Sequence, residues 1–451
     1  MFGRITLYKA KVAENPKMLI VQNEKMLDLI KYNYTVEKIH KIVEFLDKKN
    51  TLNFFPLSTG LFSAAVTTEE TEYTGYQQVW VRDNIHVAHA HYVFGDYNTT
   101  IKNLNSLMEY FKNYRQKFER IICFPSLANN VMERPHVRFD GEKLQEINEK
   151  WSHAQNDALG YFLWLYCKLL NEDLLIIEKE NIDILALFPL YFNAISYWKD
   201  EDSGHWEEER KIEASSIGVV IAGLKAIKNT FIKYHNISQH LVYKNEFVTI
   251  DFLDKLIQKG TNALNEILPY ECKEAGEKMR KYDSALLFLV YPLEVVEGEM
   301  ADQIVQNVIN NLQGDYGIRR YLLDSFWAAD YRTRLSPEQR TADISDDMSY
   351  RNSLIQEGQE AQWCIFDPII SVIFGLKFQQ TQQEKYLKQQ IFYLNRSLGQ
   401  ITEEKSRTGE FKCPELYYLE DGKYMANDAT PLLWTQANLR IALKKMEENL
   451  L

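Results

Sequence analysis

IGVVIAGL, at residues 217–224, is a stretch without a single charged or hydrogen-bonding side chain. It lies in a segment, residues 214–230, whose composition predicts a helix. A helix that lacks a polar face has to be enclosed by the rest of the protein. Its small residues Gly218, Ala222 and Gly223 would let neighbouring helices approach closely. The stretch therefore predicts a helix in the interior of a helical protein.

Two further stretches, LGYFLWLY at 159–166 and ALLFLVY at 285–291, are also apolar almost all round. The segments between such stretches are amphipathic, with Lys, Gln and Glu on one side. From residue 35 onward this periodicity predicts about twelve helices, near residues 35–48, 84–95, 98–119, 155–171, 180–199, 214–230, 249–268, 283–296, 299–312, 359–377, 381–401 and 431–449. Enclosed helices alternate with half-exposed ones. This alternation predicts an all-α double ring, an (α/α)6 barrel, whose inner helices run parallel with their N-termini at one end.

The chain shows no composition shift that indicates a linker. Residues 35–451 are therefore predicted to form the barrel as a single domain, with residues 336–358 as a long polar loop. Residues 1–34 are predicted to pack on the barrel as an N-terminal segment, in which residues 18–30 fit either an outer helix or a strand. Residues 239–249 fit a short hairpin.

The composition argues against several kinds of partner. Hydrophobic residues make up 45% and charged residues 25% of the chain, as in ordinary soluble globular proteins. A net charge of −11 argues against nucleic acids and anionic membranes as partners. The N-terminus has no signal-peptide pattern and the chain has no apolar run of about 18 residues, so we expect a cytoplasmic protein. The sequence does not indicate an oligomeric state.

The five cysteines are odd in number, widely scattered and without a C-x-x-C pair. This pattern is typical of reduced thiols rather than of disulfides or a zinc site, and we expect no metal and no cofactor. Aromatic residues are abundant, with 27 Tyr, 23 Phe and 8 Trp. Their flat faces suit sugar rings, although many of them would simply fill a helical core.

The predicted start of each inner helix carries unusual polar and aromatic residues. These clusters are Trp80–Asp83, Trp151–Asp157, Trp206–Glu208, Lys281–Asp283, Glu360–Trp363 and Pro414–Tyr418. Helix capping accounts for an acidic or hydroxyl side chain at such a position. It does not account for the accompanying Trp and Tyr, which are costly to expose and suit the walls of a pocket. We therefore predict a ligand site at the end of the barrel where these N-termini meet.

The segment GHWEEE, residues 204–209, has two interpretations. Acidic runs mostly mark solvated faces, so the segment could be a solvated cap before the next helix. Alternatively, the apolar wall of Trp206 keeps one carboxyl group protonated near neutral pH, as an acid catalyst requires. The other clusters favour the second interpretation. A pocket of aromatics, carboxylates, an Arg and amides suits glycosidic hydrolysis, which needs two carboxyl groups; those of Glu207 and Glu415 could face each other.

Eight stretches in order along residues 50–445 make the chain resemble a known family. They are VWVRDN (79–84), WSHAQNDALGY (151–161), HWEE (205–208), EASSIGVVIAGLKAI (213–227), YDSALLFLVYPLEVV (282–296), GIRRYLLDSFWAADY (317–331), EAQWCIFDP (360–368) and CPELYY (413–418). The chain is similar to glycoside hydrolase family 15, the glucoamylase family, and especially to the branch shared with the α and β subunits of phosphorylase kinase. The resemblance implies an (α/α)6 barrel and hydrolysis of α-glucosidic bonds from non-reducing ends with inversion.

The resemblance also implies roles for individual residues. Glu207 matches the general acid of the family and Glu415 the general base. Because further charged residues follow Glu207, Glu208 stays open as an alternative acid. Arg82 and Asp83 match the pair that holds hydroxyl groups of the terminal glucose, with the Arg keeping the Asp ionised. The other residues predicted to bind substrate are Trp80, Trp151, Asp157, Trp206, Glu208, Arg320, Trp363 and Tyr417.

Three classes of function follow. The favoured one is an inverting exo-acting α-glucosidase, a glucoamylase-like glycoside hydrolase whose only expected partner is a short oligosaccharide. The alternative is a catalytically inactive carbohydrate-binding or regulatory protein, as the kinase-subunit resemblance allows. The presence of both Glu207 and Glu415 favours activity. A third class, an epimerase or lyase on the same fold, would require a central His or Tyr base instead of two opposed carboxyl groups.

Overall fold

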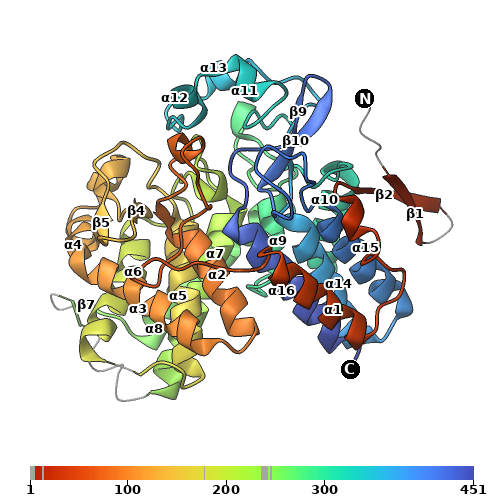
Figure 1. Ribbon diagram of the computed structural model, residues 1–451. Helices are drawn as coiled ribbons and strands as arrows, with labels where there is room; N and C mark the ends of the chain where they lie inside the picture. Colours follow the sequence, from red (N-terminus) through yellow and green to blue (C-terminus); the bar gives the residue numbers. More distant parts are fainter. Residues whose placement is uncertain (1–5, 13–14, 177, 235–241, 244–245) are drawn as a thin grey trace.

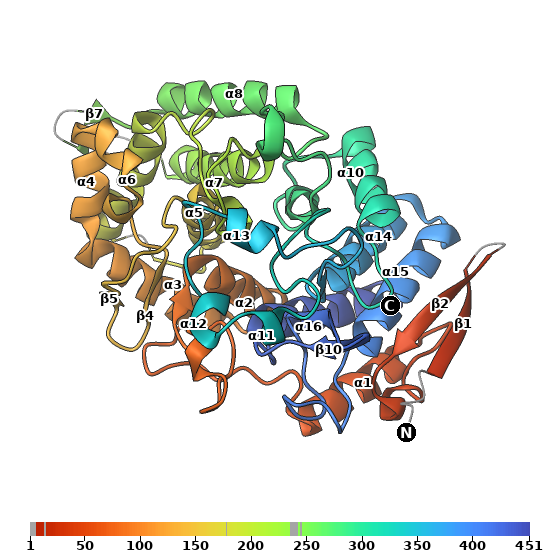
Figure 2. The same cartoon turned by 90° about the horizontal axis from the view of Figure 1, so that it is seen from above.

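The computed structural model describes residues 6–12, 15–176, 178–234, 242–243 and 246–451. Within these residues, most helices lie in an inner or an outer ring (Figures 1 and 2). The inner ring consists of α2 (Val81–Val93), α5 (Asn156–Asn171), α7 (Ala214–Lys233), α9 (Leu287–Val290), α14 (Phe366–Thr381) and α16 (Leu433–Glu448). Each of these helices contacts the next, and α16 closes the ring against α2. The predicted (α/α)6 barrel is therefore confirmed.

The outer ring covers the inner helices. It consists of α1 (Val36–Lys48), α3 (Tyr97–Asn113), α4 (Arg115–Cys123), α6 (Lys179–Ala194), α8 (Ile250–Ile267), α10 (Gly298–Asn311) and α15 (Glu384–Gly399). The amphipathic pattern of α8 shows why these helices lie outside. It buries Leu253, Leu256 and Leu264, which share one helical face, and exposes the opposite face to solvent.

Glycines bring the inner helices together as the sequence predicts. A Cβ atom on Gly223 of α7 would lie 2.8 Å from the carbonyl oxygen of Gly160 on α5. A Cβ atom on Gly160 would lie 2.9 Å from the carbonyl carbon of Val219. Any side chain at either glycine would push α5 and α7 apart. In the described part of the chain, α7 is also the one helix long and apolar enough to span a membrane, and 78% of its apolar window is buried inside the protein.

The helix expected at 283–296 is much shorter than predicted. It consists of a 3-10 turn at Ser284–Leu286 followed by the single turn of α9. Pro292 follows Tyr291 directly, and a residue before Pro is driven out of the helical region while Pro itself has no N–H to donate. The apolar pattern continues beyond the helix because Leu293 and Val296 are buried in the core in a non-helical segment.

Short strands replace the start of one predicted helix and form where no element was predicted. The helix expected from residue 359 begins only at α14, because Gln362–Trp363 form β8 and pair with β9 (Leu416–Glu420). A second strand, β10 (Lys423–Ala426), returns antiparallel to β9. The loop between them is Asp421-Gly422, both with positive φ, which is the typical turn of a two-residue hairpin. A separate sheet joins β3 (Val79–Trp80), β4 (Arg138–Asp140) and β5 (Gln145–Glu146).

The remaining segments were predicted in part. Strand β2 (Asn15–Val21) pairs with β1 (Thr6–Val12), so the strand interpretation holds for the first part of residues 18–30. The amide of Gln22 donates to the carbonyl of Gly399 at 2.9 Å, which attaches this segment to α15. Residues 239–249 include the predicted hairpin, β6 (Val242–Tyr243) with β7 (Glu246–Phe247), and its other residues up to 245 lie outside the described ones.

The polar loop predicted at 336–358 contains two helical turns, α12 (Pro337–Arg340) and α13 (Ser349–Asn352), and follows a further turn, α11 (Tyr331–Arg334). Figure 1 shows all three at the top of the molecule, beyond one end of the ring. We call residues 331–352 the strap.

Candidate active site

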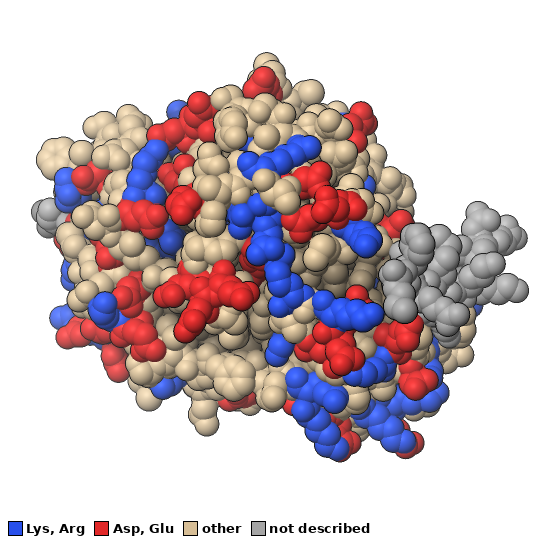
Figure 3. Space-filling view, turned by 45° about the horizontal axis from the view of Figure 1, so that its top comes forward, with Lys and Arg blue, Asp and Glu red and all other residues tan. Residues whose placement is uncertain are grey.

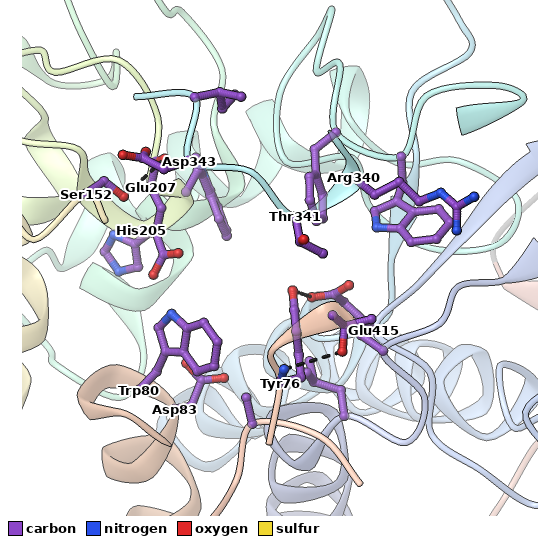
Figure 4. A pocket seen from close by; sticks show the side chains of 18 of the residues that line it. Tyr76, Trp80, Asp83, Ser152, His205, Glu207, Arg340, Thr341, Asp343 and Glu415 are labelled. Carbon is purple, nitrogen blue, oxygen red and sulfur yellow. Dashed lines mark hydrogen bonds between the residues drawn. The ribbon is translucent and has the colours of Figure 1, made fainter. Parts of the chain in front are cut away.

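The N-termini of the inner helices surround a cavity of about 1050 Å³, including the part open to solvent. Its walls come from the segments before or at the start of these helices, from the start of β9 and from the strap (Figure 4). The predicted residues that line it are Trp80, Arg82, Asp83, Trp151, Trp206, Glu207, Arg320, Trp363 and Glu415. The structure therefore brings together residues from five of the six predicted helix-start clusters, together with Arg320. The sixth cluster, Lys281–Asp283, does not line the cavity, and its Asp283 instead accepts a hydrogen bond from Trp206.

A stack of aromatic rings lies beneath the cavity, in the middle of the inner ring. We call it the plug: His86, Tyr161, His205, Phe288, Phe366 and Trp434, all buried. The rings of His86 and Trp434 stack with centroids 4.4 Å apart, and Phe288 contacts both, at 5.1 and 5.3 Å. His205 and Trp434 also line the cavity. The plug therefore forms the floor of the cavity.

Glu207 is held by an unusual backbone turn. The 3-10 turn Gly204–Trp206 ends at Glu207, which has the left-handed conformation with φ 59°, an arrangement that costs energy for a residue with a side chain and often marks a functional site. Gly204 also has positive φ, and a Cβ atom there would overlap the carboxylate of Glu213. Packing on Glu213 therefore fixes the turn that presents Glu207 to the cavity.

The carboxylate of Glu207 accepts two hydrogen bonds. Arg82 Nη2 and Gln155 Nε2 each donate to its Oε1, both at 3.2 Å. Burial raises the pKa of Glu207 above its ordinary value, and the nearby Arg82 and Arg138 oppose this rise. Hydrogen bonds from the Gln155 and Trp80 side chains also oppose the rise. A carboxyl group with a raised pKa that lines the cavity suits an acid catalyst.

Glu208, the alternative acid, has the opposite environment. Its carboxylate accepts hydrogen bonds from Arg320 at 2.8 Å, Arg280 at 3.2 Å, Arg351 at 3.3 Å and the Tyr321 hydroxyl at 2.7 Å. We call these four donors the Glu208 cage. The positive charges of its three arginines, together with that of Lys211, overcome the effect of burial and lower the pKa of Glu208 to about 2. Such a group is ionised at any physiological pH. Glu208 is therefore a poor proton donor.

Trp206 forms a wall beside Glu207. Its indole Nε1 donates to both carboxylate oxygens of Asp283, at 3.0 and 3.1 Å. The guanidinium of Arg320 lies 5.1 Å from the ring centroid of Trp206 and 5.0 Å from that of Trp363. These two rings also contact each other, with centroids 5.8 Å apart. Each wall residue is thus fixed by a charged partner.

Glu415 lies across the cavity from Glu207 (Figure 4). The Tyr76 hydroxyl donates to its Oε1 at 2.8 Å, and Asn427 Nδ2 donates to its Oε2. Burial raises the pKa of Glu415 to about 7, and the two donors oppose this rise. Donors that favour the charged form, together with a position on the opposite wall, suit a base that activates water.

Arg82 and Asp83 both line the cavity, but Arg82 does not keep Asp83 ionised as the sequence predicts, because burial outweighs its charge. Arg82 Nη1 donates instead to Asp157 at 2.8 Å, to Gln155 at 3.0 Å and to the Gly204 carbonyl. Neighbouring residues on a helix point in directions about 100° apart, so Arg82 and Asp83 face different partners. Asp83 reaches the cavity, but burial raises its pKa to about 7 rather than leaving it firmly ionised.

Three predicted substrate-binding residues, all within the described chain, do not line the cavity: Asp157, Glu208 and Tyr417. Asp157 lies fully buried behind Arg82, which it holds in place. Glu208 is enclosed by its cage. The Tyr417 hydroxyl donates to the Gln400 carbonyl at 2.7 Å, so its ring faces α15 rather than the cavity. These residues support the walls instead of forming them.

Several lining residues were not predicted from the sequence. Tyr76 lies in an irregular loop before β3 and belongs to none of the recognised stretches. Residues 340–344 belong to the strap, which was predicted only as a polar loop. The length and polarity of that loop were the available signal, because long loops in compact domains are often binding loops.

Comparison with known proteins places the chain among carbohydrate-active enzymes and their relatives. The family model described as glycosyl hydrolases family 15 matches residues 50–368. Over 333 residues the chain is 24% identical to a probable phosphorylase b kinase regulatory subunit alpha of Caenorhabditis elegans, covering 67% of this chain and 25% of that protein. It is 25% identical over 207 residues to the Escherichia coli K12 lipoprotein YgeQ, covering 41% of this chain and 78% of that protein. The chain thus matches about a quarter of the length of the kinase subunit.

Solved structures share the fold. A wild-type glycosidase has a TM-score of 0.58 at 16% identity, covering 91% of this chain and 97% of its own. The glucoamylase of Saccharomycopsis fibuligera has a TM-score of 0.55 at 12% identity, covering 93% and 97%. A bacterial glucoamylase complexed with acarbose has a TM-score of 0.52 at 16% identity, covering 87% and 53%. At these identities the likeness shows the six-hairpin fold alone.

Proposed function

Because the chain belongs to glycosyl hydrolase family 15, we propose that it is an inverting, exo-acting α-glucosidase that removes terminal α-linked glucose from short oligosaccharides. The observation that carries this proposal is the meeting of Glu207 and Glu415 on opposite walls of one cavity (Figure 4). An inverting hydrolase needs two carboxyl groups on opposite faces of the sugar, with room for a water molecule between.

The proposed mechanism uses the different surroundings of the two glutamates. Glu207 protonates the glycosidic oxygen as the leaving sugar departs, and its raised pKa keeps a proton available. Glu415 removes a proton from the water that attacks the anomeric carbon from the other side. Tyr76 and Asn427 hold its carboxylate in position and favour its charged form.

The other lining groups provide recognition. Trp80, Trp151 and Trp206 offer apolar faces to the sugar ring. The indole Nε1 atoms of Trp151 and Trp363 are buried without a protein hydrogen-bond partner. Buried polar groups normally find a partner, and sugar hydroxyl groups would serve as acceptors here.

The second candidate function is regulatory or carbohydrate-binding without catalysis. It is supported by the likeness to the phosphorylase b kinase regulatory subunit alpha. Under this alternative the cavity binds sugar but no glucose is released. Assays of maltose, isomaltose and trehalose for glucose release distinguish the two, and binding without release on every substrate would favour the second.

We expect the first product to be β-glucose. Water activated by Glu415 attacks from the face opposite to Glu207, so the configuration at the anomeric carbon inverts. Proton NMR of an early time point, before mutarotation, resolves the two anomers. Initial release of α-glucose would exclude an inverting mechanism for these two residues.

The pH dependence should report the ionisation of Glu415. With α-glucosyl fluoride, whose fluoride leaves without a proton, only the base has to be in the correct form. Because Glu415 acts as its carboxylate and its pKa is raised to about 7, kcat/KM should rise with pH through about 7 and then level off. Tyr76→Phe removes a donor that lowers this pKa, so the rise should move to higher pH. A rise that moves to lower pH in the variant contradicts the assignment of Glu415.

A further inference from the structure

The strap crosses the mouth of the cavity and is fixed at both ends by buried carboxylates. At one end Asp428 is paired with Arg332 at 3.6 Å and Arg340 at 4.0 Å. Arg340 Nη1 also donates to the Tyr73 hydroxyl at 3.1 Å. At the other end Arg351 reaches down into the Glu208 cage. Residues 341–344 lie between these anchors and line the cavity, as does Arg340 itself.

The strap runs from one catalytic wall to the other. In Figure 4, Asp343 lies on the side of Glu207 and Ser152, Arg340 lies on the side of Glu415, and Thr341 lies between them. On the face shown in Figure 3, acidic and basic side chains lie side by side over this end of the molecule. Fixed ion pairs at both ends therefore hold residues 341–344 as a wall of the cavity rather than as a free loop.

Asp343 is a polar residue of this wall, and one of its two carboxylate oxygens lacks a hydrogen-bond donor. Its side chain is only 7% exposed. Its Oδ1 accepts from the amide of Ser345 at 3.0 Å. Its Oδ2 is buried with no hydrogen-bond donor within 3.5 Å. Lys150 Nζ, the cation paired with it, lies 3.8 Å away. Leaving a buried carboxylate oxygen without a donor costs free energy, so this oxygen is ready to accept a hydrogen bond from a ligand.

The position of Asp343 indicates which part of a ligand it meets. The terminal glucose has to lie deep, between Glu207 and Glu415 and above the plug. The glycosidic oxygen then lies beside Glu207, and the next sugar unit extends from it towards the mouth. Asp343 lies on the Glu207 side, in the segment that crosses the mouth.

We propose that Asp343 is a specificity-determining residue whose Oδ2 accepts a hydrogen bond from a hydroxyl group of the sugar on the leaving-group side. This inference rests on the proposed function, because it takes Glu207 as the group next to the scissile bond. The strap then selects substrates whose second unit is a sugar and places that unit for protonation.

The test compares Asp343→Asn with Asp346→Asn. Asn at 343 keeps the acceptor for Ser345 but places an NH₂ group where Oδ2 was. Asp346 is a matched control, because it is an exposed carboxylate on the strap that pairs with the same Lys150. The substrates are the best-cleaved glucose disaccharide among maltose, isomaltose and trehalose, and α-glucosyl fluoride, which has no second sugar.

We expect Asp343→Asn to lower kcat/KM for the disaccharide by about 10- to 100-fold, the effect of losing a hydrogen bond to a charged group. Hydrolysis of α-glucosyl fluoride should change by less than about 3-fold, and Asp346→Asn should change neither rate. Equal losses on both substrates, or an equal loss in Asp346→Asn, would overturn the assignment, because the effect would then come from the shape of the strap.

Calorimetric binding separates failure of this inference from failure of the proposed activity. If the wild-type protein cleaves neither substrate, yet binds maltose about 10-fold more tightly than Asp343→Asn does and glucose equally well, the assignment of Asp343 stands and the activity fails. If the two proteins bind maltose equally, the assignment of Asp343 is overturned whatever the activity.

Discussion

Glu207→Gln is expected to lower kcat for a glucose disaccharide by about 10²- to 10⁴-fold, the usual contribution of a general acid. The amide keeps an acceptor for Arg82 and Gln155 but cannot give a proton to the glycosidic oxygen. With α-glucosyl fluoride the loss should be less than about 10-fold, because fluoride departs without protonation. Glucose release and fluoride release measure the two rates.

The control for this variant is Glu209→Gln, two residues further along the same acidic run. Glu209 is exposed and does not line the cavity, so its replacement should leave both rates unchanged. The free energy of unfolding of both variants should stay within about 1 kcal/mol of the wild type. If Glu207→Gln keeps near-normal turnover of every disaccharide that the wild type cleaves, Glu207 is not the acid.

Glu415→Gln is expected to lower kcat by a similar factor, about 10²- to 10⁴-fold, but on both kinds of substrate. Water has to be activated whichever group leaves, so hydrolysis of α-glucosyl fluoride should also be slowed by loss of the base. An amide can still accept from Tyr76 and would keep the wall in place. The rate with α-glucosyl fluoride divided by the rate with a disaccharide should therefore rise in Glu207→Gln and stay near the wild-type value in Glu415→Gln.

A suitable control is Glu420→Gln on the same hairpin. Glu420 lies at the end of β9 and accepts a hydrogen bond from the Tyr418 hydroxyl at 2.6 Å, away from the cavity. The Glu420→Gln variant should hydrolyse both substrates at the wild-type rate. If Glu415→Gln loses disaccharide hydrolysis while it keeps fluoride hydrolysis, Glu415 acts on the leaving group and the two roles have to be exchanged.

The ring of helices could be predicted because its cause is local. Stretches such as residues 159–166 and 217–224 lack a polar face, and that property alone requires an enclosed position. Because the inner helices run parallel, residues just before or at the start of each one lie at the same end of the barrel. This is why Trp80, Trp206 and Glu415 could be assigned to one site before their positions were known.

The parts that failed depend on contacts between distant segments. Glu207 and Glu208 are adjacent in the chain, and their different pKa values come from groups far away in sequence. Arg280, Arg320 and Arg351 converge on Glu208 only after folding. The sequence around Trp206 does not indicate that these three arginines contact Glu208. Asp343 is a similar case, because its role depends on two anchors that hold the strap across the mouth.

Two shorter features had local signals in the sequence. The Asp421-Gly422 turn indicates a hairpin at β9 and β10, where no element was predicted. Pro292 indicates the end of α9, where the apolar spacing predicted a longer helix. Strand residues such as Leu416 and Tyr418 are fully buried, and periodicity over so few residues does not distinguish a strand from a helix.

The plug has a consequence for the order in which products depart. Aromatic rings close the middle of the barrel, so under the proposed function the released glucose would lie at the closed end of the cavity. The shortened chain would lie between that glucose and bulk water and would have to dissociate first. We therefore expect each oligosaccharide to be released after the loss of a single glucose unit and to bind again before the next one is removed.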